Sequence, residues 1–276
     1  MGRLCIVKPL LELKQVSLAY HSPQGELAVI SNLSFSVREG EFLAIVGPSG
    51  CGKSTILNLI SGLLQPEQGE ICIQRRPGSG SVMHIGYMLQ KDHLFEWRTI
   101  YRNVMLGLEI QHQKTEEKKK QVQKMLETYG LHKFENAHPS QLSGGMRQRA
   151  ALIRTLALEP DILLLDEPFS ALDYQTRLNV SDDIGRIIRH EGKTAILVTH
   201  DISEAISMAD RVMVLTSRPA HLKREVEIVL ENPDRTPIAS RNDPRFKYYF
   251  NLIWKELNDH DRDVPGAESV FEKTQS

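Results

Sequence analysis

The sequence predicts an α/β fold: a mostly parallel sheet, an N-terminal antiparallel β portion and a helical insertion. Continuous apolar runs without charge are typical of parallel strands covered on both faces. Three such runs are Phe42–Val46, Ile162–Leu165 and Ala195–Val198. Segments with helical spacing lie between the last two, and a strand–helix–strand series implies right-handed parallel crossovers.

The N-terminal residues carry the alternating pattern of strands that bury one face. Apolar residues alternate at the start of Leu11–Tyr20, and Leu33, Phe35 and Val37 alternate strictly. Ser22–Gly25, between these two segments, is a turn signal. We expect the antiparallel portion here.

Residues from about 90 to 159 predict the helical insertion. Thr115 precedes an acidic pair and then apolar residues at helical spacing, and Gly130 stands where that helix would stop. A second helix is expected after Ser143, ending before Pro160. We expect residues 1–230 to form one domain that includes the insertion, and residues 231–276 to form a helical extension and tail.

The sheet pattern resumes after Pro160. A helix that ends at Gly192 lies between the second and third apolar runs, and Val212–Leu215 predicts a further strand. Asp201, with Glu204 three residues later, indicates a helix that begins with a capping box.

Beyond Val229 the sequence patterns that predict helices and strands become weaker. Residues 232–237 are expected to form a loop, and the last dozen residues are expected to fray. Between them, aromatic and apolar residues recur at helical spacing from Phe246 to Leu257. Such a stripe favours a helix that packs against the core or a partner.

The composition of the chain limits the classes of function that it can have. The chain has 276 residues, 41% of them hydrophobic, and a net charge of −1. A neutral balance argues against nucleic acid as the main partner. Three cysteines without metal-ligand spacing fit a reducing compartment. No run of 18 apolar residues occurs, so we expect a soluble chain that reaches a membrane only through a protein partner.

The segment after the first apolar run fits the phosphate-binding pattern G-x-x-x-x-G-K-[ST] between a strand and a helix. Its glycines let backbone N–H groups turn toward phosphates, and the helix N-terminus adds favourable potential. Lys53 would reach the β- and γ-phosphates, and Ser54 would offer its hydroxyl to Mg²⁺. The expected nucleotide-binding residues are Gly47, Pro48, Ser49, Gly50, Cys51, Gly52, Lys53, Ser54 and Thr55.

Polar residues end the apolar runs at the sheet edge where ligands bind. Asp166 is placed to hold the water shell of the metal, and Glu167 to polarise an attacking water. His200 follows the third run and could hydrogen-bond the γ-phosphate or that water. Gln90, near the start of the insertion, carries an amide that could ligate Mg²⁺.

A second glycine-rich helix start stands at Ser143-Gly144-Gly145. Ser143 suits an N-cap, and the glycines expose backbone N–H groups. These residues fit an ordinary capped helix as well as a second phosphate site. One sheet folded around one nucleotide has little use for two such starts, so the second makes sense if it serves a nucleotide held by another subunit.

Taken together and in order, these motifs resemble the nucleotide-binding subunit of an ATP-binding cassette (ABC) transporter. The resemblance covers roughly residues 11–230 and includes Leu142–Gln148 as the family signature and Ser170–Asp173 as its D-loop. It implies that Tyr20 stacks on adenine and that Asp166 ends the Walker B motif. It also implies that Glu167 is the general base, His200 the switch histidine and Gln90 the Q-loop glutamine.

The resemblance further implies a dimer, with two copies or a copy and a homologue closing head to tail around two ATP. Each ATP, with its Mg²⁺, would lie between Gly47–Ser54 of one subunit and Ser143, Gly144, Gly145 and Asp173 of the other. The metal site would comprise Ser54, Gln90 and, through water, Asp166. Permease subunits would hold the chain at the cytoplasmic face of the membrane, and a solute-binding protein would act indirectly.

The stretch Leu89–Ile100 resembles the nitrate, sulfonate and taurine importer ATPases, as does Arg245–Trp254. Its apolar Leu94, Phe95 and Trp97 would line a groove for a short helix of the permease, or simply pack the insertion. The transported solute is bound elsewhere, so this chain does not name it.

Three alternatives stay open at this point. One is a non-transport ABC ATPase acting on DNA or ribosomes, which usually needs a long coiled-coil insertion or a second cassette that this chain lacks. Another is the ATPase of an exporter. The last is a P-loop kinase or GTPase, against which the signature and the Gln90–His200 set speak.

Overall fold

The computed structural model describes residues 9–23, 25–74, 84–231 and 237–259. The turn residue Gln24, most of the loop expected at 232–237 and the tail expected to fray lie outside these ranges. Within them, no helix is long and apolar enough to cross a membrane.

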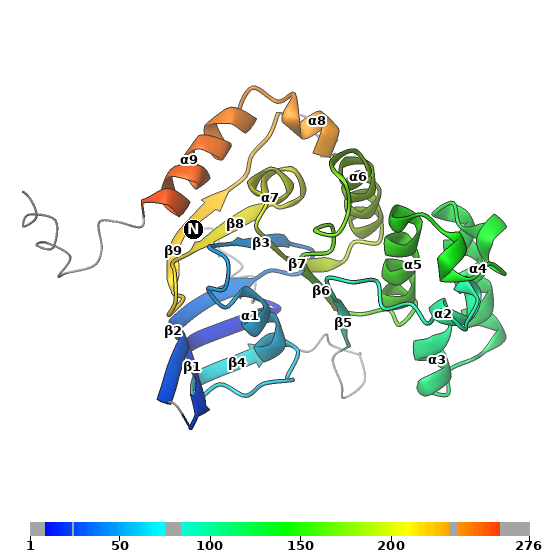
Figure 1. The fold of residues 1–276 in the computed structure, drawn as a ribbon, viewed down its shortest axis with the longest axis horizontal. Coiled ribbons are helices and arrows are strands. Elements are labelled where there is room, and N and C mark those ends of the chain that lie inside the picture. The colour runs from blue at the N-terminus through cyan, green and yellow to red at the C-terminus, as the bar shows by residue number, and fades with distance from the viewer. Residues whose placement is uncertain (1–8, 24, 75–83, 232–236, 260–276) are drawn as a thin grey trace, which may run out of the picture.

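Among the described residues, the main sheet has six strands in the order β5-β6-β7-β3-β8-β9 (Figure 1). The first five run parallel, and β9 pairs antiparallel with β8. Their bounds are β3 Phe42–Val46, β5 Ile85–Met88, β6 Ile162–Asp166, β7 Thr194–Thr199, β8 Arg211–Leu215 and β9 Leu222–Glu227. The expected parallel α/β core is confirmed, and the apolar runs form its central strands.

A second, antiparallel sheet has the order β2-β1-β4. Its strands are β1 Leu11–Ser22, β2 Gly25–Val37 and β4 Gln68–Ile73. Leu33, Phe35 and Val37 are buried while Ser34 is exposed, as the alternation predicted. The antiparallel portion is therefore confirmed, although β4 and the first half of β2 had no clear signal.

Alternate residues of β3 supply two hydrophobic cores. Ala44 and Val46 belong to the core shared with the helices on one face. Leu43 and Ile45 belong to the core shared with α1 and the antiparallel sheet on the other. The sheet is thus covered on both faces, and its carboxyl edge stays free for ligands. The helices that cover it are α1 Lys53–Ile60, α6 Tyr174–His190, α7 Ile202–Met208, α8 Pro237–Arg241 and α9 Phe246–Asn258.

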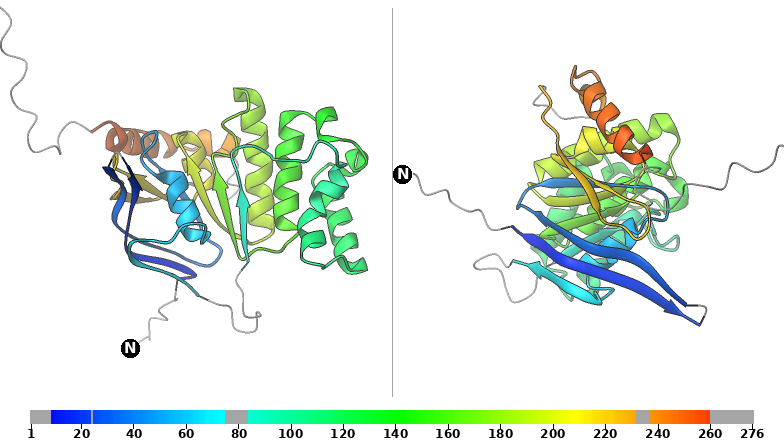
Figure 2. Two further views of the ribbon diagram at one scale, coloured as in Figure 1. Left: turned by 60° about the horizontal axis from the view of Figure 1, so that its bottom comes forward. Right: turned by 90° about the vertical axis from the view of Figure 1, so that its left-hand side faces the viewer.

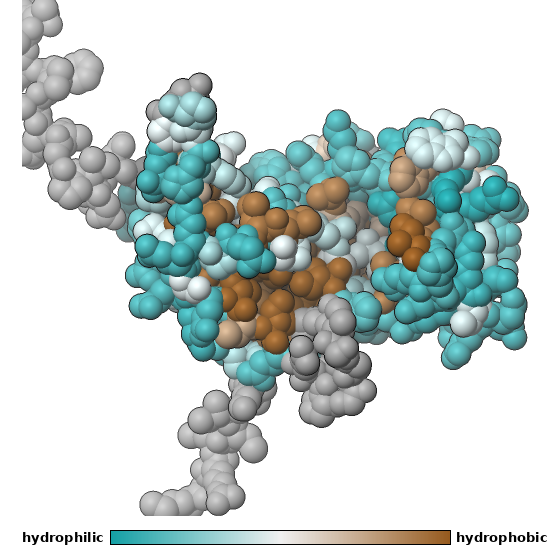
Figure 3. Space-filling view, turned by 90° about the horizontal axis from the view of Figure 1, so that it is seen from below, coloured by the Kyte–Doolittle hydropathy of each residue, from teal (hydrophilic) through white to brown (hydrophobic). Residues whose placement is uncertain are grey.

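The helical part extends from one end of the molecule, beyond β5 (Figures 1 and 2). Its helices are α2 Ile100–Val104, α3 Leu106–Ile110, α4 Glu116–Thr128 and α5 Gly144–Leu156. Thr115 caps α4 and Ser143 caps α5, as expected. Figure 3 shows from below that this end is largely hydrophilic, whereas apolar side chains gather toward the antiparallel sheet and α1.

The expected capping box at α7 is wrong in its second half. Asp201 caps the helix by accepting from the N–H groups of Ser203 and Glu204. Glu204 does not return a bond to Asp201, because Thr199 Oγ1 accepts from the Asp201 N–H and donates to Glu204 Oε2. The threonine hydroxyl thus satisfies both groups.

The aromatic stripe near the C-terminus forms α9, as predicted. Ile253 is completely buried in the core, and α9 lies against α7 and β8. Phe250 and Trp254 stack with ring centroids 6.1 Å apart.

Candidate nucleotide site

A cavity of about 360 Å³ lies at the loop between β3 and α1. The described residues that line it are Tyr20, Val29, Ser49, Gly50, Gly52, Lys53, Ser54, Thr55, Glu167 and Arg218. All but Val29 and Arg218 were expected at a nucleotide site. Residues from five separate parts of the chain therefore meet at one hollow.

The loop takes a shape that requires glycine at two positions. Gly50 has φ +72° and Gly52 has φ +118°, where other residues are strained. Gly52 directly precedes α1, and no described side chain caps that helix. Its first N–H groups therefore remain available to an anion, with the helix dipole favouring negative charge.

Cys51 and Pro48 serve the loop in ways the pattern alone does not reveal. The Cys51 side chain is buried, and a Cβ on Gly47 would lie 2.9 Å from its Sγ. Burial raises the pKa of the Cys51 thiol, so an unreactive packing role fits. The Cys51 N–H donates to Pro48 O at 3.3 Å, which tightens the turn. Any nucleotide contact by Cys51 would come from its backbone.

Lys53 is buried against its own loop. Its Nζ donates to Gly47 O at 3.0 Å and to Pro48 O at 3.1 Å. The side chain is 6% exposed. An ammonium held by carbonyls at the start of α1 is positioned to exchange them for phosphate oxygens.

Ser54 and Asp166 meet across the sheet edge. Ser54 Oγ donates to Asp166 Oδ1 at 2.9 Å, and the hydroxyl of Tyr87, on β5, lies 3.4 Å from Asp166 Oδ2. Burial raises the pKa of the Asp166 carboxyl and nearby Glu167 adds to the effect, against hydrogen bonds from Ser54 and Tyr87. Hydroxyl and carboxylate oxygens are ligands that Mg²⁺ prefers, and a cation would offset the cost of charging Asp166. These residues fit the expected metal.

Glu167 follows Asp166 with a left-handed backbone. Its φ is +45°, unusual for a residue with a side chain, and its N–H donates to Val198 O at 2.9 Å on the neighbouring strand. His200 Nδ1 lies 3.1 Å from Glu167 Oε2. Since backbone strain gathers at functional positions, this conformation favours a functional role for the pair.

Gln90 and Tyr20 each contact the hydroxyl group of another residue. Gln90 Nε2 donates to Ser170 Oγ at 3.0 Å, which ties the nitrogen of its amide to the loop after β6. Tyr20 is 44% exposed, and its hydroxyl lies 3.4 Å from Thr55 Oγ1. An exposed ring beside the phosphate loop is open to stacking by a base.

The second glycine-rich start stands apart from the cavity. Ser143 Oγ accepts from the N–H of Met146 at 3.3 Å, and none of the described lining residues comes from α5. Asp173 caps α6 by accepting from the N–H of Thr176, and this hydrogen bond lowers the pKa of the Asp173 carboxyl. The two helix starts are neighbours, because a Cβ on Gly144 would lie 3.0 Å from Leu172 Cδ2. One copy of the chain does not bring these residues to its own phosphate loop.

The loop after Gln90 is fastened to α5. Arg154 donates to the backbone carbonyls of Asp92 and His93, each at 2.7 Å. Arg147 Nε donates to Asp92 Oδ2 at 3.1 Å. On this loop Trp97 is 73% exposed and lies 4.7 Å from Phe95, measured between ring centroids. The loop thus presents an aromatic surface on a fixed base.

Sequence reasoning missed Tyr87, which lies beside Asp166, and Arg218, whose Nε donates to Gly50 O at 3.1 Å. Tyr87 had one available signal, since it immediately precedes the segment leading to Gln90. Arg218 had none, because it lies in the turn between β8 and β9, outside every motif.

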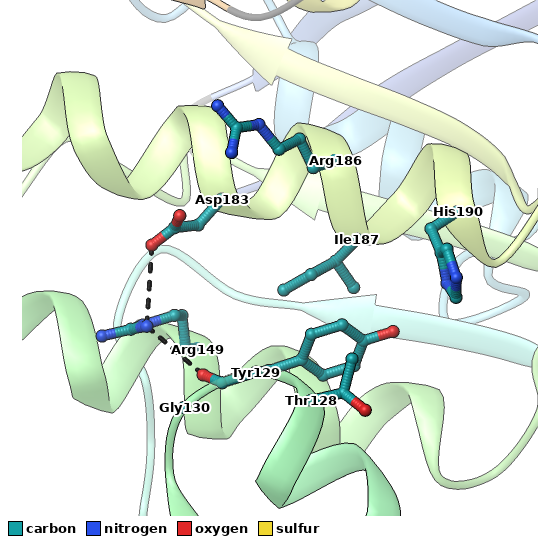
Figure 4. A pocket seen from close by; sticks show the side chains of 8 residues that line it. All are labelled: Thr128, Tyr129, Gly130, Arg149, Asp183, Arg186, Ile187 and His190. Carbon is teal, nitrogen blue, oxygen red and sulfur yellow. Dashed lines mark hydrogen bonds and ion pairs between the residues drawn. The ribbon is translucent and has the colours of Figure 1, made fainter.

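A second cavity, of about 380 Å³, lies between the end of α4, α5 and α6 (Figure 4). Arg149 donates to Tyr129 O and lies 3.6 Å from Asp183 Oδ2. Arg186 pairs with Asp182 on its own helix. Since these two arginines are paired and no expected site residue lines this cavity, the cavity at the phosphate loop is the stronger candidate for a nucleotide site.

Comparison with known proteins shows the family to which such a chain is similar. The family profile described as "ABC transporter" matches residues 30–170. The uncharacterized ABC transporter ATP-binding protein YtlC of Bacillus subtilis is 44% identical over 90% of this chain and 95% of its own length.

Two similar proteins have transport functions in their names, and each is 37% identical. The aliphatic sulfonates import ATP-binding protein SsuB of Bacillus licheniformis matches over 87% of this chain and 91% of its own length. The nitrate import ATP-binding protein NrtD of Synechocystis matches over 88% of this chain and 93% of its own length.

A solved structure shares the fold. It is the ATP-binding cassette MJ0796, dimeric, in a post-hydrolysis state bound to ADP and Pi. The TM-score is 0.66 at 31% identity, over 79% of this chain and 99% of the other.

Proposed function

This chain belongs to the ABC transporter family as an ATP-hydrolysing cassette, and from that premise we propose that it powers an importer of small anionic or zwitterionic solutes of the nitrate, sulfonate and taurine type. The observation that carries the proposal is the likeness, along nearly the whole chain, to the SsuB and NrtD import proteins. The aromatic loop after Gln90 supports it, since a partner that moves with the cassette needs a fixed surface.

The proposed chemistry begins with Lys53 and the N–H groups at the start of α1, which would bind the phosphates of ATP. Ser54 and Asp166 would hold Mg²⁺, which supplies charge neutralisation at the phosphates when bound. Tyr20 would stack on the adenine. Gln90 would sense whether phosphate is bound, and the loop that follows it would pass this state to the helical insertion.

Glu167 would act as the general base by accepting a proton from the attacking water. His200, in contact with the Glu167 carboxylate, would orient that side chain and hydrogen-bond the γ-phosphate or the water. Negative charge on the departing phosphate would be met by Lys53 and the helix dipole.

The site would be completed by a second copy. Ser143, Gly144, Gly145 and Asp173 lie away from the cavity of their own chain, and the dimeric MJ0796 cassette supports assembly in pairs. Closure would depend on the γ-phosphate, so hydrolysis would release the pair.

Motion would pass to permease subunits at Phe95 and Trp97, which would keep the chain at the cytoplasmic face of the membrane. Leu94 is buried in the core and packs the insertion instead. A solute-binding protein outside the cell would act through that permease. The transported solute would never touch this chain.

The decisive test is co-purification of the untagged permease with this chain, together with hydrolysis assays on ATP and GTP. We expect a membrane complex whose ATP hydrolysis rises with the solute-binding protein and its solute. A complex active without any binding protein would favour an exporter, recovery of DNA or ribosomes a non-transport ATPase, and GTP preference a different P-loop enzyme.

A further inference from the structure

Arg218 reaches the phosphate loop from the turn between β8 and β9, 168 positions after Gly50. Both its Nε and its Nη2 donate to the Gly50 carbonyl. The same residue lines the nucleotide cavity. A charged guanidinium with two donors on one loop carbonyl makes a strong, directional bond.

The turn that carries Arg218 has a fixed base. Ala220 is completely buried, its N–H donates to Val29 O at 2.8 Å, and its carbonyl accepts from Ser31 N at 3.0 Å. The His221 N–H donates to Thr216 Oγ1 at 3.1 Å, which closes the turn. Arg218 is thus presented from a turn joined to β2, next to the cavity.

Gly50 is a loop residue that benefits from such support. Its φ of +72° is one of several conformations open to glycine, and freezing a glycine costs more backbone entropy than freezing another residue. Lys53 already holds the carbonyls of Gly47 and Pro48. With Gly50 held as well, both arms of the loop are fixed by a cation.

We propose that Arg218 is a positioning residue of the ATP site, which fixes Gly50 so that the phosphate loop has its binding shape before the nucleotide arrives. This inference rests on the proposed phosphate-binding role of Gly47–Ser54. Preorganisation of this kind improves affinity and leaves the chemical step unchanged.

The test measures ATP affinity, KM and kcat of the full chain after Arg218→Gln. We expect Kd and KM for ATP to rise about tenfold, since bonds from charged donors are among the stronger ones, with kcat changed by less than about twofold. Arg218→Lys keeps the charge but loses the paired donors, and should recover part of the affinity. Arg224→Gln is the matched control, because Arg224 on β9 pairs with Glu256 away from the cavity, and it should leave both constants unchanged.

Unchanged affinity in Arg218→Gln overturns the inference, as does a fall in kcat at constant KM. Melting temperatures without nucleotide, compared with Arg224→Gln, separate lost folding from lost affinity. If Arg218→Gln does not fold, an affinity of Arg218→Lys equal to wild type overturns the inference instead. Lys53→Ala separates failure of this inference from failure of the proposed function. If the Lys53→Ala variant binds ATP normally, the phosphate-loop assignment itself is wrong.

Discussion

Glu204 is an acid whose surroundings disfavour its charge. Its side chain is 6% exposed, and burial raises its pKa to about 7. The hydrogen bond from Thr199 and the nearby Arg177 oppose this shift, while Asp201 adds to it. The folded chain therefore keeps a proton here that the unfolded chain releases near pH 4.5.

Stability should consequently fall as pH rises from about 5 to 7, since only the unfolded chain gains from ionisation there. Glu204→Gln removes this titration and should flatten the slope. Between pH 5 and 8, the unfolding free energy of wild type should fall by up to about 3 kcal/mol more than that of Glu204→Gln. Urea denaturation measures both. Glu26→Gln, at an exposed position on β2, is the control. Parallel pH profiles for Glu204→Gln and wild type would contradict the prediction.

Lys53→Ala removes the ammonium that lies over the phosphate loop. ATP affinity should drop at least thirtyfold, roughly the loss of one or two charged hydrogen bonds. Titration with a fluorescent ATP analogue measures it, and Lys255→Ala, exposed on α9, should bind as wild type does. Equal affinity in both variants would exclude Lys53 from phosphate binding.

The residues of the site were predictable where the chemistry lies in one segment or at the end of a buried strand. The phosphate loop is contiguous, and Asp166 and His200 follow apolar runs whose parallel alignment brings them to one edge. Arg218 and Tyr87 were not predictable, because their roles exist only through tertiary contacts. The direction of the Gln90 amide depends likewise on Ser170, eighty positions away.

At the scale of elements, the starts of α5 and α6 pack through glycine. A Cβ on Gly145 would lie 2.5 Å from Val180 Cγ2, whereas one on Gly144 would lie 3.0 Å from Leu172 Cδ2, the tip of a flexible side chain. Gly145→Ala should therefore cost about 1–3 kcal/mol of stability and Gly144→Ala clearly less. Denaturant unfolding measures both variants. Equal losses of unfolding free energy would contradict tight packing between Gly145 and Val180.

Central strands were easier to predict than edge strands for a physical reason. β3, β6 and β7 are covered on both faces and read as apolar runs. β4 and β9 lie at sheet edges with mixed exposure, so their residues alternate weakly. Their pairing partners, β1 and β8, determine them more than their own composition does.

At the scale of the whole molecule, the arrangement predicts that nucleotide and assembly are coupled. Glu167→Gln should bind ATP without hydrolysing it, so the phosphates would stay between two copies. Sedimentation should show a monomer without nucleotide and a dimer with ATP. Adding Ser143→Arg to this variant places a large cation at the second helix start and should restore the monomer. A monomer of Glu167→Gln with saturating ATP would refute assembly around the nucleotide.

The hold of Arg154 on the loop after Gln90 has an evolutionary consequence. Arg154 bonds the carbonyls of Asp92 and His93, and peptide carbonyls are present whatever side chains the loop carries. Substitutions at positions such as Phe95 and Trp97 would therefore change the exposed aromatic surface without detaching the loop from α5. Anchoring through the main chain would let the proposed permease-binding surface acquire new side chains in related sequences while the loop keeps its position on α5.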